Sequence, residues 1–381
     1  MRPEIVVDLA AIRHNARTMA ALVAPAALMT VVKADGYGHG IVESGRAARA
    51  GGATWLGVAT VPEALALRDA GATGRLLCWL TLPADAEDGS LARAVEADVD
   101  ITAYTVARLD QVVAAGSGGH GPRVQLKVDT GLSRGGSTLD DWPDLVARAA
   151  EHERAGRARV TGVWSHFACG EEPEHPANDL QERRFHEALR LAEEAGLRPE
   201  VRHLANSAAA ILRPSSRLDL VRVGLATFGL DPAPDAHHDT DLRPAMTVTA
   251  PLALAKPIAK GEGVSYGHHW VADEATTVGL VPAGYGDGVP RHGSNVLEVA
   301  VEGVRRPVRG RVCMDQVVVD LGADPGSVAE GDTAILFGPG DDGGPVAQEW
   351  ADMLDTIHYE VVTGVRGRVV RTYVGGDEGV R

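Results

Sequence analysis

The chain contains few aromatic residues and few cysteines. Only 4% of its 381 residues are Phe, Trp or Tyr, and its three cysteines, Cys78, Cys169 and Cys313, are far apart in the sequence. This spacing fits neither a metal site nor a disulfide framework, and it suits a reducing compartment. We therefore expect no bound metal and a cytoplasmic location, and each tyrosine becomes a candidate for a specific role.

Two further absences limit the partners of the chain. The net charge is −15, so the surface should not attract a phosphate backbone. No stretch approaches the ~20 apolar residues of a membrane span. The N-terminal MRPEIVVDLAAI carries acids within its apolar run, unlike a secretory signal. We expect neither nucleic acid nor membrane among the partners.

The length and the 45% hydrophobic content suit two domains with real cores. Eight short apolar runs alternate with helical segments from about residue 28 to 230, which predicts an α/β fold of the (β/α)8 TIM-barrel type. A doubly wound open sheet is the alternative, but such sheets usually have about six strands. The eight runs are LMTVVKAD, WLGVAT, RLLCWL, DITAYT, VQLKVDT, VTGVWSH, EVRHLANS and LDLVRVG.

The clearest helical segment covers residues 179–196. Its predicted apolar stripe is Leu180, Phe185, Leu189 and Ala192, with Asp179 as the expected cap and Gly196 as the expected end.

The character of the chain changes after the barrel pattern. Residues 231–245, DPAPDAHHDTDLRPA, are typical of a linker, and the rest reads as strands apart from one helical segment, AQEWADMLDTIHYEV (347–361). We predict a barrel domain over residues 1–235 and a mostly β domain over 236–381, with residues 1–10 as a candidate to pair with the second domain.

Polar residues gather at the predicted C-terminal strand ends, where barrels of this kind form their active sites. Each has an ordinary explanation when taken alone: Lys33 could be salt-bridged, His166 could be a hydrogen-bonded core residue, and Lys127 could pair with Asp129. Together they predict a polar, anionic ligand, because unpaired burial costs kilocalories for each group. The set is Lys33, Asp35, Thr60, Lys127, Asp129, His166, Asn206, Ser207, Arg222 and Gly224.

The last two barrel strands suggest a phosphate site. Ser207 begins an Ala-rich helical segment and Gly224 exposes bare backbone, although a plain turn explains both equally well. A lysine beside a phosphate site suggests pyridoxal phosphate, which needs a Schiff-base lysine and a partner for its ring nitrogen. Arg222 could be that partner. Since arginine stays protonated, it would keep the ring nitrogen unprotonated and weaken the cofactor as an electron sink.

The chain resembles the alanine racemase family. TVVKADGYGHG (30–40) is similar to the family's cofactor-lysine signature, and the likeness covers essentially the whole chain in order. It continues through VDTGLSRGG (128–136), GVWSHFA (162–168), HLANSAAAIL (203–212), VRVGLATFGLDP (221–232), VSYGH (264–268), PAGYGDG (282–288), GRVCMDQ (310–316) and HYEVVTGV (358–365).

The resemblance implies a pyridoxal 5′-phosphate enzyme that interconverts L- and D-alanine and supplies D-alanine for peptidoglycan. It implies a homodimer with shared active sites. Lys33 would hold the cofactor and act as base on one face of the substrate, and Tyr266 of the partner subunit would act on the other. Arg222 would face the ring nitrogen, and His166 would lie beside it.

The resemblance also implies the remaining roles. Arg134 and Met314 of the partner subunit would receive the substrate carboxylate. Lys127 matches a lysine that becomes a carbamate in many relatives. The implied cofactor-binding residues are Lys33, Tyr37, His166, Asn206, Ser207, Arg222, Gly224, Leu225 and Tyr359, and the implied entrance residues are Tyr285, Arg291 and Arg311.

Other functions differ from this one in specific features. A decarboxylase of this fold should pair the ring nitrogen with an acid, and a cofactor-free Schiff-base aldolase has no need of Arg222. A single-domain carrier of pyridoxal phosphate would lack the second domain and Tyr266. A racemase of broader specificity remains open.

Overall fold

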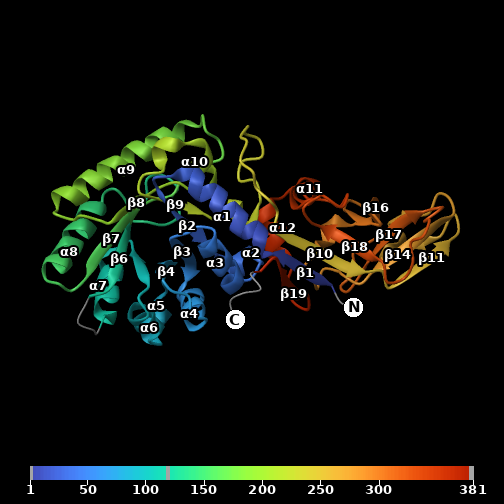
Figure 1. Ribbon diagram of the computed structural model, residues 1–381, viewed down its shortest axis with the longest axis horizontal. Helices are drawn as coiled ribbons and strands as arrows, with labels where there is room; N and C mark the ends of the chain where they lie inside the picture. Colours follow the sequence, from blue (N-terminus) through green and yellow to red (C-terminus); the bar gives the residue numbers. More distant parts are fainter. Residues whose placement is uncertain (1–2, 117–120, 377–381) are drawn as a thin grey trace. The chain divides into compact units, whose positions relative to one another are not determined.

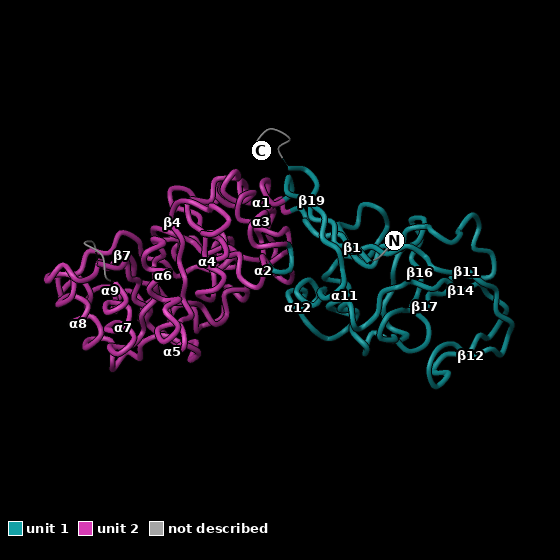
Figure 2. Tube along the Cα trace, turned by 90° about the horizontal axis from the view of Figure 1, so that it is seen from below, with its two compact units in different colours: residues 1–11, 37–39, 243–381 teal, residues 12–36, 40–242 magenta. Residues whose placement is uncertain are grey.

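The computed structural model describes residues 3–116 and 121–376. The described chain divides into two compact units (Figure 2). The barrel unit comprises the described residues 12–36, 40–116 and 121–242, and the β unit comprises residues 3–11, 37–39 and 243–376.

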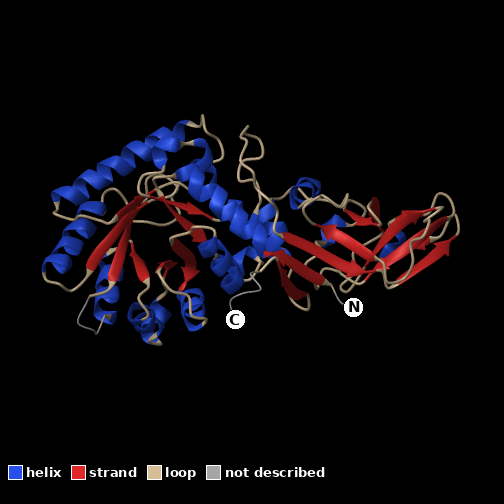
Figure 3. Cartoon of the chain, in the orientation of Figure 1, coloured by secondary structure: helices blue, strands red, loops and turns tan. Residues whose placement is uncertain are grey.

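The barrel unit has an eight-stranded parallel sheet in the order β8-β7-β6-β5-β4-β3-β2-β9. The first and last strands of this order meet through two hydrogen bonds, from Arg222 N to Ala205 O at 3.0 Å and from Asp219 N to Arg202 O at 3.2 Å. The predicted (β/α)8 barrel is therefore confirmed, with helices outside its strands (Figure 3). The strands are β2 (Ala27–Val31), β3 (Trp55–Thr60), β4 (Arg75–Leu80), β5 (Asp100–Ala103), β6 (Arg123–Lys127), β7 (Arg159–Trp164), β8 (Val201–His203) and β9 (Leu220–Val223).

Helix α1 precedes the first barrel strand, and the other helices of this unit connect successive barrel strands (Figure 1). The helices are α1 (Leu9–Val23), α2 (Lys33–Tyr37), α3 (Ile41–Ala50), α4 (Val61–Asp69), α5 (Pro83–Glu87), α6 (Ser90–Glu96), α7 (Val106–Ala115), α8 (Trp142–Arg154), α9 (Pro176–Glu194) and α10 (Ser207–Leu212), with 3₁₀ turns at Pro214–Ser216 and Leu225–Phe228.

Helix α9 corrects part of the sequence prediction. Phe185, Leu189 and Ala192 are buried as expected, but Leu180 is 39% exposed. The helix begins three residues before Asp179, because His175 caps it by accepting a hydrogen bond from Ala177 N and Pro176 supplies the first turn. Asp179 is therefore not the cap.

Part of the barrel interior is apolar. Met29, Trp55, Leu77, Val201 and Leu220 pack into one buried cluster. The barrel strands also carry buried polar residues that belong to the site described below, among them Asp100, Gln125, His203 and Arg222.

The β unit has a nine-stranded sheet in the order β11-β14-β17-β16-β15-β18-β10-β1-β19. The N-terminal strand β1 (Glu4–Asp8) lies between β10, to which it is antiparallel, and β19, to which it is parallel. The other strands are β10 (Met246–Pro251), β11 (Leu254–Ile258), β14 (Thr276–Val281), β15 (Glu298–Val301), β16 (Val304–Arg309), β17 (Val317–Gly322), β18 (Thr333–Phe337) and β19 (Val370–Val374), with a separate hairpin of β12 (Gly263–Val264) and β13 (Trp270–Val271).

The mostly β character of this unit is confirmed, but the single predicted helix is two helices. These are α11 (Ala347–Met353) and α12 (His358–Gly364), and 3₁₀ turns lie at Tyr266–His268 and Arg291–Gly293. The chain turns between the helices at Asp355, where φ is 52°. Among the described residues, no helix combines the length and hydrophobicity that crossing a membrane requires.

Candidate active site

The loop after β2 positions Lys33. The strand ends at Val31, earlier than the sequence pattern suggests, and Ala34, Asp35 and Gly36 follow with φ of 53°, 53° and 64°. This is a left-handed turn, which non-glycine residues adopt only at a cost. Lys33 and Asp35 therefore lie beyond the strand, not on it.

The Glu63 carboxylate braces this turn. One oxygen accepts from Ala34 N at 2.7 Å, and the other accepts from Ala59 N at 2.9 Å and Thr60 N at 3.0 Å. The carboxylate thus ties the lysine loop to the end of β3. Burial and then the charge of Arg134 lower the pKa of Lys33, and Glu63 partly opposes this. The amine of Lys33 is therefore easier to deprotonate than that of an ordinary lysine.

Arg222, on β9, is 5% exposed and well held. Its Nη2 donates to Ser165 O at 2.7 Å, to Leu204 O at 3.1 Å and to His166 Nδ1 at 3.0 Å. Its Nη1 lies 3.0 Å from His203 Nδ1. Burial lowers the pKa of Arg222, but guanidinium remains charged in proteins.

His166, two residues beyond β7, is placed beside Arg222 as the resemblance implied. Burial is the first cause that lowers its pKa well below 6.5, followed by the charges of Arg222, Arg134, Lys127 and Lys33. The imidazole is therefore neutral near pH 7. Since Nδ1 accepts from Arg222, the proton of the neutral ring is on Nε2.

Lys127 ends β6, and its Nζ lies 4.6 Å from the ring centroid of Trp164. Its pKa is lowered to about 8 by burial, then by Arg222 and Arg134, against the opposing charge of Asp129. Asp129 uses one oxygen to accept from Gly131 N at 2.9 Å and Ser133 N at 3.1 Å. It therefore shapes the loop that carries Arg134.

The loops after β8 and β9 meet through Ser207. Asn206 caps α10 by accepting from Ala209 N at 2.9 Å, and Gly224 N donates to Ser207 Oγ at 3.0 Å. Leu225 follows at the start of a 3₁₀ turn and is buried. The hydroxyl and the bare backbone that the sequence singled out therefore lie together at this end of the barrel.

The β unit holds the other predicted residues. Tyr37 is buried with its ring centroid 6.1 Å from that of Tyr359, and burial followed by Tyr359 raises its pKa. Thus these two phenols, distant in sequence, lie side by side.

Four further residues are on loops that hydrogen bonds join in pairs. Tyr285 N donates to Cys313 O at 3.0 Å, just before Met314, and Ser265 Oγ donates to Arg311 O at 2.7 Å, just before Tyr266. A Cβ at Gly284 would lie 2.3 Å from Cys313 O, so only glycine permits this approach. The side chains of Tyr266, Met314 and Tyr285 are 72%, 55% and 43% exposed. Arg291 is also exposed, in the 3₁₀ turn Arg291–Gly293.

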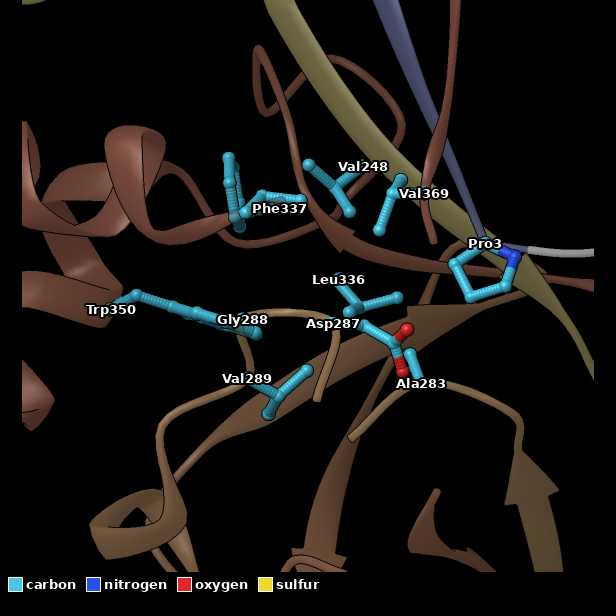
Figure 4. A pocket seen from close by; sticks show the side chains of 11 residues that line it. Pro3, Val248, Ala283, Asp287, Gly288, Val289, Leu336, Phe337, Trp350 and Val369 are labelled. Atoms are coloured by element: carbon cyan, nitrogen blue, oxygen red, sulfur yellow. The ribbon is translucent and has the colours of Figure 1, made fainter. Parts of the chain in front are cut away.

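A cavity elsewhere in the β unit is not this site. It is lined mainly by apolar side chains around Asp287, including Val289, Leu336 and Trp350 (Figure 4), and has room for about one water molecule. Asp287 is 3% exposed and paired with Arg368 at 3.0 Å. It also accepts from Gly284 N at 3.0 Å, so it serves the turn that carries Tyr285.

Sequence reasoning missed four residues of the barrel site: Glu63, Gln125, Trp164 and His203. Gln125 was detectable in principle, because Arg123, Gln125 and Lys127 put polar groups at every second position of one strand. Glu63 was not detectable from its own neighbourhood, where it also completes the capping box of α4. Its bond to Ala34 depends on the tertiary fold.

The barrel mouth therefore presents a readily deprotonated lysine, a fixed arginine, a neutral histidine and further cations. Among the described residues there is no cluster of metal-ligating side chains. These features define a barrel enzyme that acts by acid–base chemistry on a small anionic substrate.

Comparison with known proteins specifies the family. Residues 7–232 match the alanine racemase N-terminal domain and residues 245–373 match the alanine racemase C-terminal domain. An alanine racemase of Mycolicibacterium vanbaalenii is 52% identical over 99% of this chain and 96% of its own length, and one of Thermobifida fusca is 51% identical over 97% of each. The crystal structure of alanine racemase from Streptomyces lavendulae has a TM-score of 0.95 at 47% identity, covering 99% of this chain and 98% of that one.

The chain belongs to the alanine racemase family. It is an isomerase with alanine racemase activity, which interconverts L- and D-alanine.

Proposed function

We propose that this racemase uses pyridoxal 5′-phosphate, with Lys33 and Tyr266 as proton carriers on opposite faces of the substrate. The observation that supports the cofactor most directly is the hydrogen bonding of the Arg222 guanidinium. Its Nη1 and Nη2 have partners, whereas among the described residues no acceptor is found for Nε. A donor left over on a side chain that is only 5% exposed fits a ring nitrogen that accepts a hydrogen bond.

The other cofactor contacts are those that the family resemblance implies. Lys33 would hold it through its ε-amine. The phosphate would be held by Tyr37, Ser207, Tyr359 and the backbone of Gly224 and Leu225, and Asn206 would orient the start of α10. When bound, pyridoxal phosphate withdraws electrons and makes the α-hydrogen of an amino acid acidic.

The protein groups then move the proton. Lys33, with its lowered pKa, would take or give the α-proton on one face, and the phenol of Tyr266 would do so on the other. A single base returning the proton to the same face would leave the configuration unchanged. Arg222 would limit electron withdrawal by the cofactor. Because the guanidinium stays protonated, it can only donate to the ring nitrogen, which therefore stays unprotonated. His166 would connect Arg222 with Tyr266.

The substrate carboxylate would be received by Arg134 and Met314. Arg134 is exposed at the barrel mouth, and its charge lowers the pKa of Lys33, Lys127 and His166. Tyr285, Arg291 and Arg311 would line the entrance. Lys127, as a carbamate, would become an anion that orients Arg134.

We propose a homodimer in which Tyr266 and Met314 complete the site of the other subunit. The exposure of both side chains within one chain supports this, since large apolar groups at 72% and 55% exposure suit an interface. The proposed role is the supply of D-alanine for peptidoglycan in the cytoplasm.

The test is to purify the protein, treat it with borohydride and map the modified peptide. We expect visible absorbance from the cofactor and covalent fixation on Lys33, with D-alanine formed from L-alanine. Lys33→Ala should abolish both, whereas Lys256→Ala, which removes an exposed lysine of the β unit, should preserve them. Colourless protein that racemises alanine without responding to added cofactor would contradict the proposal.

A further inference from the structure

Four buried side chains form a continuous hydrogen-bonded chain inside the barrel, from Arg222 to Asp100. Arg222 Nη1 is 3.0 Å from His203 Nδ1, and His203 Nε2 is 2.8 Å from Gln125 Oε1. Gln125 Nε2 is 3.2 Å from Asp100 Oδ2. His203, Gln125 and Asp100 are all completely buried, so water does not supply alternative partners.

At the Asp100 end of this series of hydrogen bonds, the direction of donation is fixed. The Asp100 carboxylate receives Arg75 Nη2 at 2.8 Å, Arg123 Nε at 2.6 Å and Thr161 Oγ1 at 2.7 Å. A carboxylate held by two guanidinium groups acts only as an acceptor. The neighbour of Asp100 on the path to Arg222 must therefore be a donor.

This direction of donation passes from residue to residue. Gln125 must turn its NH₂ toward Asp100, so its carbonyl oxygen faces His203. His203 must then donate from Nε2, which leaves Nδ1 as an acceptor for Arg222. Burial and the charge of Arg222 lower the pKa of His203 well below 6.5, so the ring is neutral and has one acceptor nitrogen.

Trp164 packs against both the His203 imidazole and the Arg222 guanidinium. Its ring stacks on His203 with centroids 5.6 Å apart and an interplanar angle of 8°, and the Arg222 guanidinium carbon lies 4.7 Å from its ring centroid. The imidazole therefore cannot rotate freely, and only its tautomer decides whether Arg222 has an acceptor there.

We propose that Asp100, Gln125 and His203 form a positioning relay that fixes the orientation of Arg222 from the opposite end of the barrel. This inference deepens the proposed function and rests on it only for the role of Arg222 toward the cofactor. With the other tautomer, His203 would turn an N–H toward the N–H of Arg222. Two donors repel, so Arg222 would shift and its Nε would no longer be held toward the ligand.

The first test measures the histidine tautomer in the unmodified protein. Protein labelled with ¹⁵N in its imidazoles is examined by correlation of ring nitrogens with ring hydrogens, and His203 is assigned through the signal lost in His203→Asn. The relay requires Nε2–H. A wild-type His203 found as Nδ1–H, or as a mixture of tautomers, would overturn it. This result does not depend on whether the cofactor binds.

The second test breaks the relay at Gln125. Gln125→Met keeps the length of the side chain but removes both polar groups, so we expect His203 to lose its single tautomer. In protein loaded with pyridoxal phosphate ¹⁵N-labelled at its ring, the ring-nitrogen signal should shift, and kcat for racemisation should fall about tenfold with a smaller change in KM.

Thr161→Val is the matched control, because it removes one hydrogen bond to the same Asp100 carboxylate without interrupting the path to Arg222. It should lower stability but leave the His203 tautomer and the ring-nitrogen signal unchanged. Equal shifts in both variants, or no tautomer change in Gln125→Met, would overturn the relay. Failure of the protein to bind the cofactor would contradict the proposed function and leave the tautomer measurement standing.

Discussion

Lys127 provides the sharpest quantitative prediction, because its environment makes its amine reactive near neutral pH. Carbon dioxide reacts only with a neutral amine, and an ordinary lysine is almost entirely charged at pH 7.5. Burial, Arg222 and Arg134 lower the pKa of Lys127 from 10.5 to about 8. We predict that Lys127 is a carbamate in buffer that contains bicarbonate.

The size of the effect follows from the shift in pKa. Well below both pKa values, a shift of this size raises the neutral fraction about 300-fold relative to an unperturbed lysine. Because the pKa of Lys127 is lowered, its neutral form increases as the pH rises through about 8. The exposed Lys256 and Lys260 serve as internal references for the measurement. The carbamate would carry a negative charge among cations, which stabilises it further.

The assay uses ¹³C-bicarbonate and NMR, with Lys127→Arg as the control that retains a cation but cannot form the carbamate. We expect one carbamate signal in the wild type and none in the variant. In buffer free of carbon dioxide, trace acetylation should modify Lys127 with a midpoint near pH 8. If Lys127 instead acetylates with the same pH dependence as Lys256 and Lys260, the reasoning from burial and neighbouring charge is refuted.

Three further predictions concern the proposed site and the core. Lys33→Ala should abolish turnover of both alanine enantiomers in a coupled assay, and turnover surviving in either direction would contradict its role. Tyr266→Ala should slow solvent isotope exchange at Cα of one enantiomer far more than of the other, and equal losses would count against two opposed bases. Trp142→Ala should lower the free energy of unfolding by about 3–5 kcal/mol in urea titrations. The reason is that Trp142 is fully buried and donates to Ala188 O at 2.9 Å, so a loss below about 1 kcal/mol would show that the site collapses around the cavity.

The barrel strands were predictable where local pattern and burial agree. The bounds of β3 (Trp55–Thr60) and β4 (Arg75–Leu80) match the apolar runs WLGVAT and RLLCWL residue for residue. The prediction failed at the loop of Lys33, because the apolar pattern continues past the strand. The left-handed turn there is held by Glu63, which is 29 residues away from Ala34.

The same distinction applies to the cap of α9 and to the barrel interior. Asp179 has the right side chain for a cap, but Pro176 and His175 begin the helix earlier, and the loop before the helix decides between them. The pattern of its own strand marks Gln125 as polar and inward-facing, but neither Gln125 nor His203 reveals its partner locally. The fold brings His203 Nε2 within 2.8 Å of Gln125 Oε1 across a sequence separation of 78.

By itself, the sequence determined the family, the two kinds of fold and the residue types available for chemistry, because strand periodicity and motif order are properties of neighbouring residues along the chain. Only the tertiary structure decided the protonation of Lys127 and His166, the tautomer of His203 and the bracing of Lys33. Those properties depend on burial and on the charges and hydrogen-bond partners that surround each group, and these come together from strands far apart in the sequence.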